Sequence, residues 1–183
     1  MRILTYTGAL RFYTRALYDQ LDDDDADPEA LLTQAHDAYK QRLSEIAGTL
    51  GDLISISHPF HVDNALIARL RHDREAGVLH LTLRCGNLIE GYRDLILAYH
   101  DVELDHADEN ILNDIAATTV GGQIFDHDVY CHELDVAEDA RIEHRILFNC
   151  GPEEVAIRCR RLVHTKQDQP DRTLPALAER TGG

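Results

Sequence analysis

Several features that usually identify a chemistry are missing from this sequence. Its glycines form neither a GxxxxGK(S/T) loop nor a GxGxxG turn, which argues against nucleotide binding. None of the three serines, Ser44, Ser55 and Ser57, lies in the G-x-S-x-G turn of a hydrolase nucleophile. Cys131 and His132 are neighbours, but adjacent strand residues point to opposite faces and so do not pair as thiol and base. The sequence therefore offers no nucleophile of a familiar pattern.

Long apolar runs are missing as well. No stretch reaches the roughly 18 to 20 residues that cross a bilayer, and Met1–Thr7 becomes polar too early for a secretory signal. The four cysteines have no CxxC pair, and several fall at strand positions: Cys85, Cys131, Cys150 and Cys159. We expect a soluble cytoplasmic protein with reduced core thiols, no disulfide framework and no cofactor.

Lysine is scarce, since only Lys40 and Lys166 stand beside sixteen arginines, which suggests a GC-rich bacterial genome. The chain has 33 acidic residues against 18 Lys plus Arg, a formal net charge of -15. Nearly all of the excess lies in one block, because Asp94–Ala140 contains thirteen acids and no Lys or Arg. Such a block should create a coherent negative potential. It argues against nucleic-acid binding, which needs clustered basic residues.

The length of 183 residues favours a single domain. Helical signals come first and strand signals follow, which predicts an α+β fold with N-terminal helices in 1–57 packed on an antiparallel sheet of about six strands in 58–164. Residues 165–183 are polar and are predicted to form a mobile tail. The clearest helix spans Pro28–Thr49, where an apolar stripe follows a capping Asp27.

The period of the apolar residues changes to two beyond this helix. Leu79–Cys85 and Val155–Val163 both alternate apolar and polar residues, as half-buried antiparallel strands do. Further strands are predicted at Ala65–Asp73, Arg93–Leu104, Ile124–Asp135 and Arg141–Asn149, and further helices at Thr14–Leu21 and Asp108–Ala117.

Two short stretches carry a family resemblance. Arg11–Tyr18, read as Arg-Phe-Tyr-Thr-Arg-Ala-Leu-Tyr, resembles the Tyr-Phe-Thr-Lys-x-x-Tyr opening of a group of uncharacterised bacterial proteins. Phe60–Ile67 resembles a His-Asp-x-x-Ile element of the same group, although Val62 here separates His61 from Asp63. The resemblance implies helices before an antiparallel sheet, and it brings no assigned activity.

The most suggestive chemical cluster lies in the strand predicted from Ile124. Asp126, Asp128 and His132 would project from one face of that strand and could hold a divalent metal ion. Additional ligands could come from a neighbouring strand and its end: His100, Asp101, Asp105 and His106. The alternative is a plain solvated acidic face, which so many acids and eleven histidines produce by chance.

A second candidate cluster is His58, His61 and Asp63, whose spacing could bring two imidazoles and a carboxylate together. Pro59 makes the local backbone hard to predict. The alternative is that both histidines shape the entry to the sheet through hydrogen bonds to the backbone.

Arginines on the last predicted strand form a third candidate. Arg158 and Arg160, with His80, could bind an anion if their strands pair. The alternative is a solvated strand face or a guarded sheet edge.

Two functional hypotheses follow. The first is an acidic interaction module that binds a basic protein, by analogy in charge and size with bacterial immunity proteins and nucleic-acid mimics. Its predicted contact surface comprises Asp101, Glu103, Asp105, Asp126, Asp128, Glu133 and Asp135. The second is a divalent-metal-binding protein or metal-dependent hydrolase that uses Asp126, Asp128 and His132. Few basic or aromatic residues surround the acidic block, which favours a protein partner over a small substrate; a homo-oligomer is compatible with both hypotheses, and a membrane partner with neither.

Overall fold

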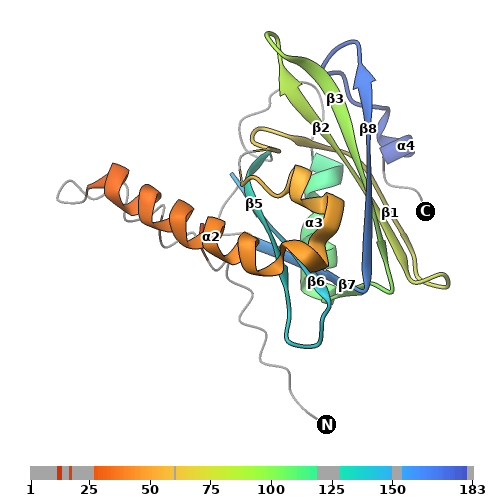
Figure 1. Cartoon of the computed structure of the whole chain (residues 1–183). Helices are drawn as coiled ribbons and strands as arrows, with labels where there is room; N and C mark the ends of the chain where they lie inside the picture. The colour runs from red at the N-terminus through yellow and green to blue at the C-terminus, as the bar shows by residue number, and fades with distance from the viewer. Residues whose placement is uncertain are drawn as a thin grey trace.

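The chain folds as an α+β protein in which helices accompany two antiparallel sheets (Figure 1). The computed structural model describes residues 12–13, 17, 27–59, 61–118, 128–149 and 154–180. The helices are α2 (Pro28–Leu50), the 3₁₀ helix η1 (Gly51–Ile56), α3 (His106–Thr118) and α4 (Leu177–Arg180). The strands are β1 (Leu66–Asp73), β2 (Val78–Asn87), β3 (Gly91–His100), β4 (Glu103–Leu104), β5 (Val129–Val136), β6 (Ile142–Phe148), β7 (Glu154–Cys159) and β8 (Arg161–Gln169).

The strands form two sheets of four instead of the single sheet of about six that the sequence predicts. Sheet A has the order β1-β2-β3-β8 and sheet B the order β4-β7-β6-β5. The α+β class and the antiparallel pairing are confirmed. The helix predicted at Thr14–Leu21 lies outside the described residues except for Leu17, as does the start of the strand predicted from Ile124. None of the described helices combines the length and apolarity needed to cross a membrane.

Two of the predicted strands each contribute to both sheets. The strand predicted at Arg93–Leu104 bends at Asp101, whose φ of 51° lies in the left-handed region, so that β3 belongs to sheet A and β4 to sheet B. The strand predicted at Val155–Val163 divides at Arg160, whose backbone N–H donates to the carbonyl of His100 over 3.1 Å. The two bends therefore lie side by side, and the chain passes between the sheets at both.

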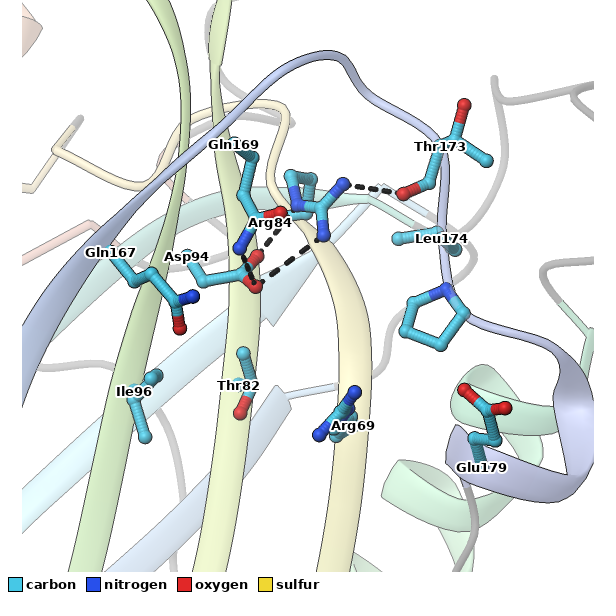
Figure 2. Close-up of a pocket in the computed structure, with 11 residues that line it drawn as sticks. Arg69, Thr82, Arg84, Asp94, Ile96, Gln167, Gln169, Thr173, Leu174 and Glu179 are labelled. Carbon is cyan, nitrogen blue, oxygen red and sulfur yellow. Dashed lines mark hydrogen bonds and ion pairs between the residues drawn. The ribbon is translucent and has the colours of Figure 1, made fainter.

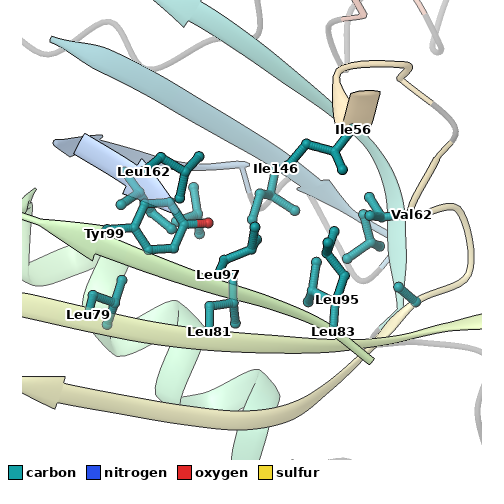
Figure 3. Packing of buried hydrophobic residues seen from close by; sticks show 14 of the residues in the cluster. Ile56, Val62, Leu79, Leu81, Leu83, Leu95, Leu97, Tyr99, Ile146 and Leu162 are labelled. Atoms are coloured by element: carbon teal, nitrogen blue, oxygen red, sulfur yellow. The ribbon is translucent and has the colours of Figure 1, made fainter. Parts of the chain in front are cut away.

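One hydrophobic cluster fills the space between the sheets (Figure 3). Alternate residues of β2 and β3, among them Leu81, Leu83 and Leu97, point from sheet A into the cluster and are fully buried. Ile146 of β6 meets them from sheet B. Each such side chain contributes about 2 kcal/mol on burial, so this shared core holds the two sheets together.

The helices close the remaining sides of this core. Leu112 and Ile115 of α3 belong to the same cluster, as do Leu53 and Ile56 of η1. α3 packs against both β1 and β7, and therefore bridges sheet A and sheet B. Its range includes the predicted Asp108–Ala117.

Helix α2 begins and ends where the sequence predicts. The Asp27 carboxylate caps its first turn, Pro28 occupies the first helical position, and Gly51 ends it with a φ of 59°. Tyr39 is buried against β5, where its hydroxyl accepts the backbone N–H of Leu134 over 2.8 Å. β5 is an edge strand, so α2 occupies hydrogen-bonding groups that would otherwise be open to another chain.

The end of the chain differs from the tail expected at 165–183. β8 runs to Gln169 and pairs with β3 along its whole length. Its sequence lacks an apolar pattern because β8 is an edge strand with one face toward solvent, and Leu162 is its only residue in the buried class. The chain then returns to α4, where the guanidinium of Arg180 is buried and donates to a carbonyl of β1.

Candidate functional site

The acidic block, predicted to form one contact surface, is divided by the fold. Asp128, Glu133 and Asp135 are only 4%, 1% and 1% exposed, and Asp126 lies outside the described residues. A contact surface needs accessible charge. The three buried carboxylates are therefore not available to a partner. The accessible part of the predicted surface is Asp101, Glu103 and Asp105.

Two of the buried carboxylates accept hydrogen bonds from distant parts of the chain. Glu133 Oε1 accepts the backbone N–H groups of Phe12 and Tyr13 at 3.0 and 2.6 Å. Asp128 Oδ1 accepts from Asn149 Nδ2 over 2.7 Å. These bonds offset the cost of burying charge. Glu133 thereby attaches Phe12 and Tyr13 to β5.

Asp135 begins a ladder of alternating charges on the outer face of sheet B. Its Oδ1 accepts from Arg42 Nε of α2 over 2.8 Å, and its Oδ2 lies 3.8 Å from Arg145 Nη1. Arg145 also pairs with Glu143, which in turn meets Arg158 Nε at 3.2 Å. All three arginines come from outside the acidic block. The block is thus neutralised internally where it is buried, which the charge count along the sequence does not show.

The exposed carboxylates gather where three turns meet. The β3–β4 bend touches the β1–β2 turn through the N–H of Val102, which donates to the Gly77 carbonyl over 3.2 Å. It touches the β5–β6 turn through Arg141, which donates to the Asp101 carbonyl over 3.3 Å. We call the carboxylates on these turns the acidic end: Glu75, Asp101, Glu103, Asp105, Glu138 and Asp139.

Arginines neutralise only part of the acidic end. Glu103 lies 2.8 Å from Arg141 Nη2, and Asp139 lies 3.2 Å from Arg158 Nη2. Asp105 accepts the N–H of Ala107 and caps α3, but it stays exposed. Four of the six carboxylates have no ion pair with any described residue, so the acidic end presents a net negative charge to solvent.

The proposed metal ligands Asp126, Asp128 and His132 do not form a ligand set in the described structure. Asp126 is not described, Asp128 is bonded to Asn149, and His132 is fully buried with both ring nitrogens engaged. Among the described residues, no group of three or more His, Cys, Asp and Glu side chains converges as a cation requires. The same holds for the added candidates His100, Asp101, Asp105 and His106.

His132 instead belongs to a buried chain of hydrogen bonds that joins the sheets. The carbonyl of His58 can only accept, so His132 Nε2 donates to it over 2.9 Å. His132 Nδ1 must then accept from His144 Nε2 at 2.9 Å, and His144 Nδ1 accepts from the Tyr99 hydroxyl at 2.6 Å. Both imidazoles are neutral in this arrangement. Burial accordingly lowers the pKa of His132 to about 4, and it lowers the pKa of His144 well below its usual value.

The cluster His58, His61 and Asp63 does not converge either. His58 contributes its carbonyl, which accepts from His132 and from the backbone N–H of His61. This agrees with the structural alternative for His58. His61 is half-buried, its Nε2 is shielded from solvent, and that atom has no hydrogen-bond partner among the described residues.

The arginine hypothesis for Arg158, Arg160 and His80 is wrong in its geometry. Arg158 lies on β7 in sheet B, where it joins the charge ladder, whereas His80 lies on β2 in sheet A. Arg160 is exposed at the bend between β7 and β8. The error arises because the predicted strand was treated as one straight element.

A first pocket, of about 480 Å³, lies on the outer face of sheet A (Figure 2). Arg84 crosses it and donates to Asp94 Oδ1 over 2.6 Å, to the Asp171 carbonyl over 3.0 Å and to the Thr173 carbonyl. Gln169 donates to the other oxygen of Asp94 over 2.8 Å. Since these charges satisfy one another, the arrangement fastens the segment after β8 to the sheet.

A second pocket, of about 570 Å³, lies beside the β2–β3 hairpin, at the top in Figure 1. The hairpin forms one wall with Tyr92 and Arg93, and the connection before β1 forms another with His61 and Asp63. Arg172 lies at its rim. We call this the hairpin pocket.

The register of sheet A explains the cations beside this pocket. The inward-facing row of β3 runs from Leu97 through Leu95 to Arg93, and Lys166 of β8 lies opposite Leu95. Arg93 and Lys166 therefore continue the inward rows just beyond the hydrophobic core. Neither has an ion-pair partner among the described residues. The alternation of β3 contained this signal, but Arg93 was predicted only as the first residue of the strand Arg93–Leu104.

The chain matches no family model, no curated protein and no solved structure. The functional argument therefore rests on the residues described above.

Proposed function

We propose that this protein is a protein-interaction module that binds a partner with a basic surface, and that the acidic end is its contact surface. The observation that supports this is the meeting of three turns, distant in sequence, whose carboxylates outnumber the arginines beside them. Electrostatic complementarity of this kind accelerates association and selects partners of opposite charge.

The proposal keeps the class of function that the composition favours but changes the contact residues. Asp128, Glu133 and Asp135 are engaged inside the protein, so they do not contribute. Glu75 and Glu138, which the sequence analysis did not select, join Asp101 and Asp105. Cys85 and Cys159 are buried free thiols, which supports a cytoplasmic location as part of the same proposal.

The test compares two variants that remove equal charge. The first, Asp101→Asn with Asp105→Asn and Glu138→Gln, neutralises the acidic end and keeps residues suited to the left-handed backbone and the helix cap. The control neutralises three exposed carboxylates on α2 and η1 with Glu29→Gln, Asp37→Asn and Asp52→Asn.

Both variants and the unaltered protein are used to capture binding proteins from a bacterial lysate at low and high salt, and the affinity of a captured basic protein is measured. We expect the acidic-end variant to bind about tenfold or more weakly and the control to bind within about threefold of the unaltered protein. Equal losses in both variants, or no salt-sensitive basic partner, would contradict the proposal.

A further inference from the structure

A separate set of charges lies beside the hairpin pocket, and it has the opposite sign. Arg93, Lys166 and Arg172 come from β3, β8 and the segment after β8, and His61 faces them from the connection before β1. We propose that the hairpin pocket binds a small anionic molecule through a carboxylate or phosphate group, held by Arg93, Lys166 and His61. This proposal is independent of the acidic end.

The first support is that Arg93, Lys166 and His61 converge although Arg93 and Lys166 form no ion pair within the described structure, even with Asp168, which lies opposite Arg93 in the pairing of β3 with β8. Burial lowers the pKa of His61 to about 4, and the positive charges of Lys166 and Arg93 lower it further in the same direction, as do His58 and His164. Within the described structure neither Arg93 nor Lys166 meets a carboxylate. Arg93 is half-buried and Lys166 is exposed, so the cost of an unpaired charge applies to Arg93.

The carboxylates that line the pocket do not neutralise these cations. Burial raises the pKa of Asp63, and the nearby carboxylate of Asp128 raises it further. A neighbouring arginine would instead lower the pKa of Asp63. Glu90 is exposed at the end of the hairpin. The anion therefore belongs on the side of Arg93 and His61.

The second support is the number of polar donors that remain available. His61 Nε2 has no hydrogen-bond partner among the described residues although it is shielded from solvent. Arg172 uses Nη2 to donate to the Asn64 carbonyl over 2.7 Å and keeps further N–H groups at the pocket rim. Arginine forks and an imidazole N–H match the oxygens of a carboxylate or a phosphate. Tyr92 adds an aromatic wall for the body of the molecule.

The experiment titrates inorganic phosphate and, separately, succinate into the full chain, with calorimetry and NMR of the His61 ring as readouts. We expect one of the two to bind saturably and to raise the pKa of His61, since the anion cancels the repulsion from the cations. Binding of phosphate alone indicates a phosphate ester as the ligand class, and binding of succinate alone indicates a carboxylate.

Three variants complete the test: Arg93→Gln, Lys166→Gln and, as a control of equal charge on the exposed side of α2, Lys40→Gln. The two pocket variants should weaken anion binding about tenfold or more, and the control should leave it unchanged. Lys166→Gln should also raise the melting temperature without added anion, because it removes repulsion. A site built from several charge-assisted hydrogen bonds should bind its anion much more tightly than about 20 mM. If neither anion saturates the protein by about 20 mM, the proposal is overturned. Equal binding by all three variants would overturn it as well.

Discussion

The two ends of this molecule differ in how their charges are paired, although the sequence shows only an excess of acid. At the acidic end, six exposed carboxylates outnumber the arginines that lie beside them, which are Arg74, Arg141, Arg158, Arg160 and Arg161. At the hairpin pocket, Arg93 and Lys166 stand without carboxylate partners among the described residues. The comparison shows that the fold determines which charged side chains are paired inside the protein and which remain accessible. Carboxylates buried in sheet B form ion pairs with arginines that lie outside the acidic block. Arg93 and Lys166, in contrast, form no ion pair with any described residue.

The largest expected effect separates the buried acids from the exposed ones. Asp135→Asn should lower the free energy of unfolding by about 3 kcal/mol, because it removes a negative charge that faces the buried guanidinium of Arg145. Asp101→Asn, the same chemical change within the same acidic block, should change it by less than about 0.5 kcal/mol. Urea unfolding of both variants at pH 7 measures the difference. Similar losses would mean that the block is not divided as described.

The pH dependence of stability should come from the buried histidine chain and, through His61, from the hairpin pocket. His132 titrates near 6.5 when unfolded and at about 4 when folded, so its contribution to stability is complete above pH 6.5 and falls as the pH drops toward 4. The loss is roughly 3 kcal/mol for this one group. His132→Gln keeps a donor for the His58 carbonyl and an acceptor for His144. It should reduce the slope of the unfolding free energy against pH by the amount that corresponds to about one proton. Chemical denaturation from pH 7.5 to pH 4 measures the slope, and an unchanged slope would contradict the neutral histidine chain.

A smaller effect distinguishes two glycines of the β2–β3 hairpin, of which Gly86 lines the hairpin pocket. Gly86 has a φ of 105°, and a Cβ there would meet the carbonyl oxygen of Gly91 at 2.1 Å, so Gly86→Ala should cost about 2 kcal/mol or more. Gly91 has a φ of 82° and open space around it, so Gly91→Ala should cost about 1 kcal/mol. Thermal unfolding ranks the two. If Gly91→Ala lowered the stability more than Gly86→Ala, the backbone conformation of the hairpin would have to differ from the one described.

The smallest effect is expected at the tip of the same hairpin. Leu88 and Ile89 are 91% and 96% exposed, and the Asn87 side chain holds their turn by accepting two backbone N–H groups at 2.8 and 3.0 Å. Leu88→Ser and Ile89→Ser should therefore leave the free energy of unfolding unchanged within about 0.5 kcal/mol. A large loss of stability would place these side chains in a contact that the described structure does not contain.

The elements that the sequence predicts well are those with local signals. Helix α2 has a cap, a stripe and a terminating glycine, and β2 has strict alternation, so their ranges match to within a few residues. The division into two sheets was missed because the bends at Asp101 and Arg160 carry neither Gly nor Pro. A straight strand was the simpler interpretation of each pattern.

The candidate sites were harder to predict because their partners are remote in sequence. Asp135 reads as a solvated acid until α2 brings Arg42 beside it, 93 positions away. His132 reads as a metal ligand until β6 supplies His144 and sheet A supplies Tyr99. The inward position of Arg93 could be predicted from alternation, but its nearness to Lys166 depends on the pairing of β3 with β8.

That pairing also determines the order in which the protein can assemble. During synthesis the first three strands of sheet A emerge long before their fourth, and until β8 is available β3 presents a row of open backbone N–H and C=O groups. Contacts so distant along the chain form slowly, and an open strand edge is where nascent chains associate wrongly. Because β8 continues directly from β7, both sheets wait for the same late stretch of polypeptide. Neither sheet can therefore be completed until β7 and β8 have been synthesised.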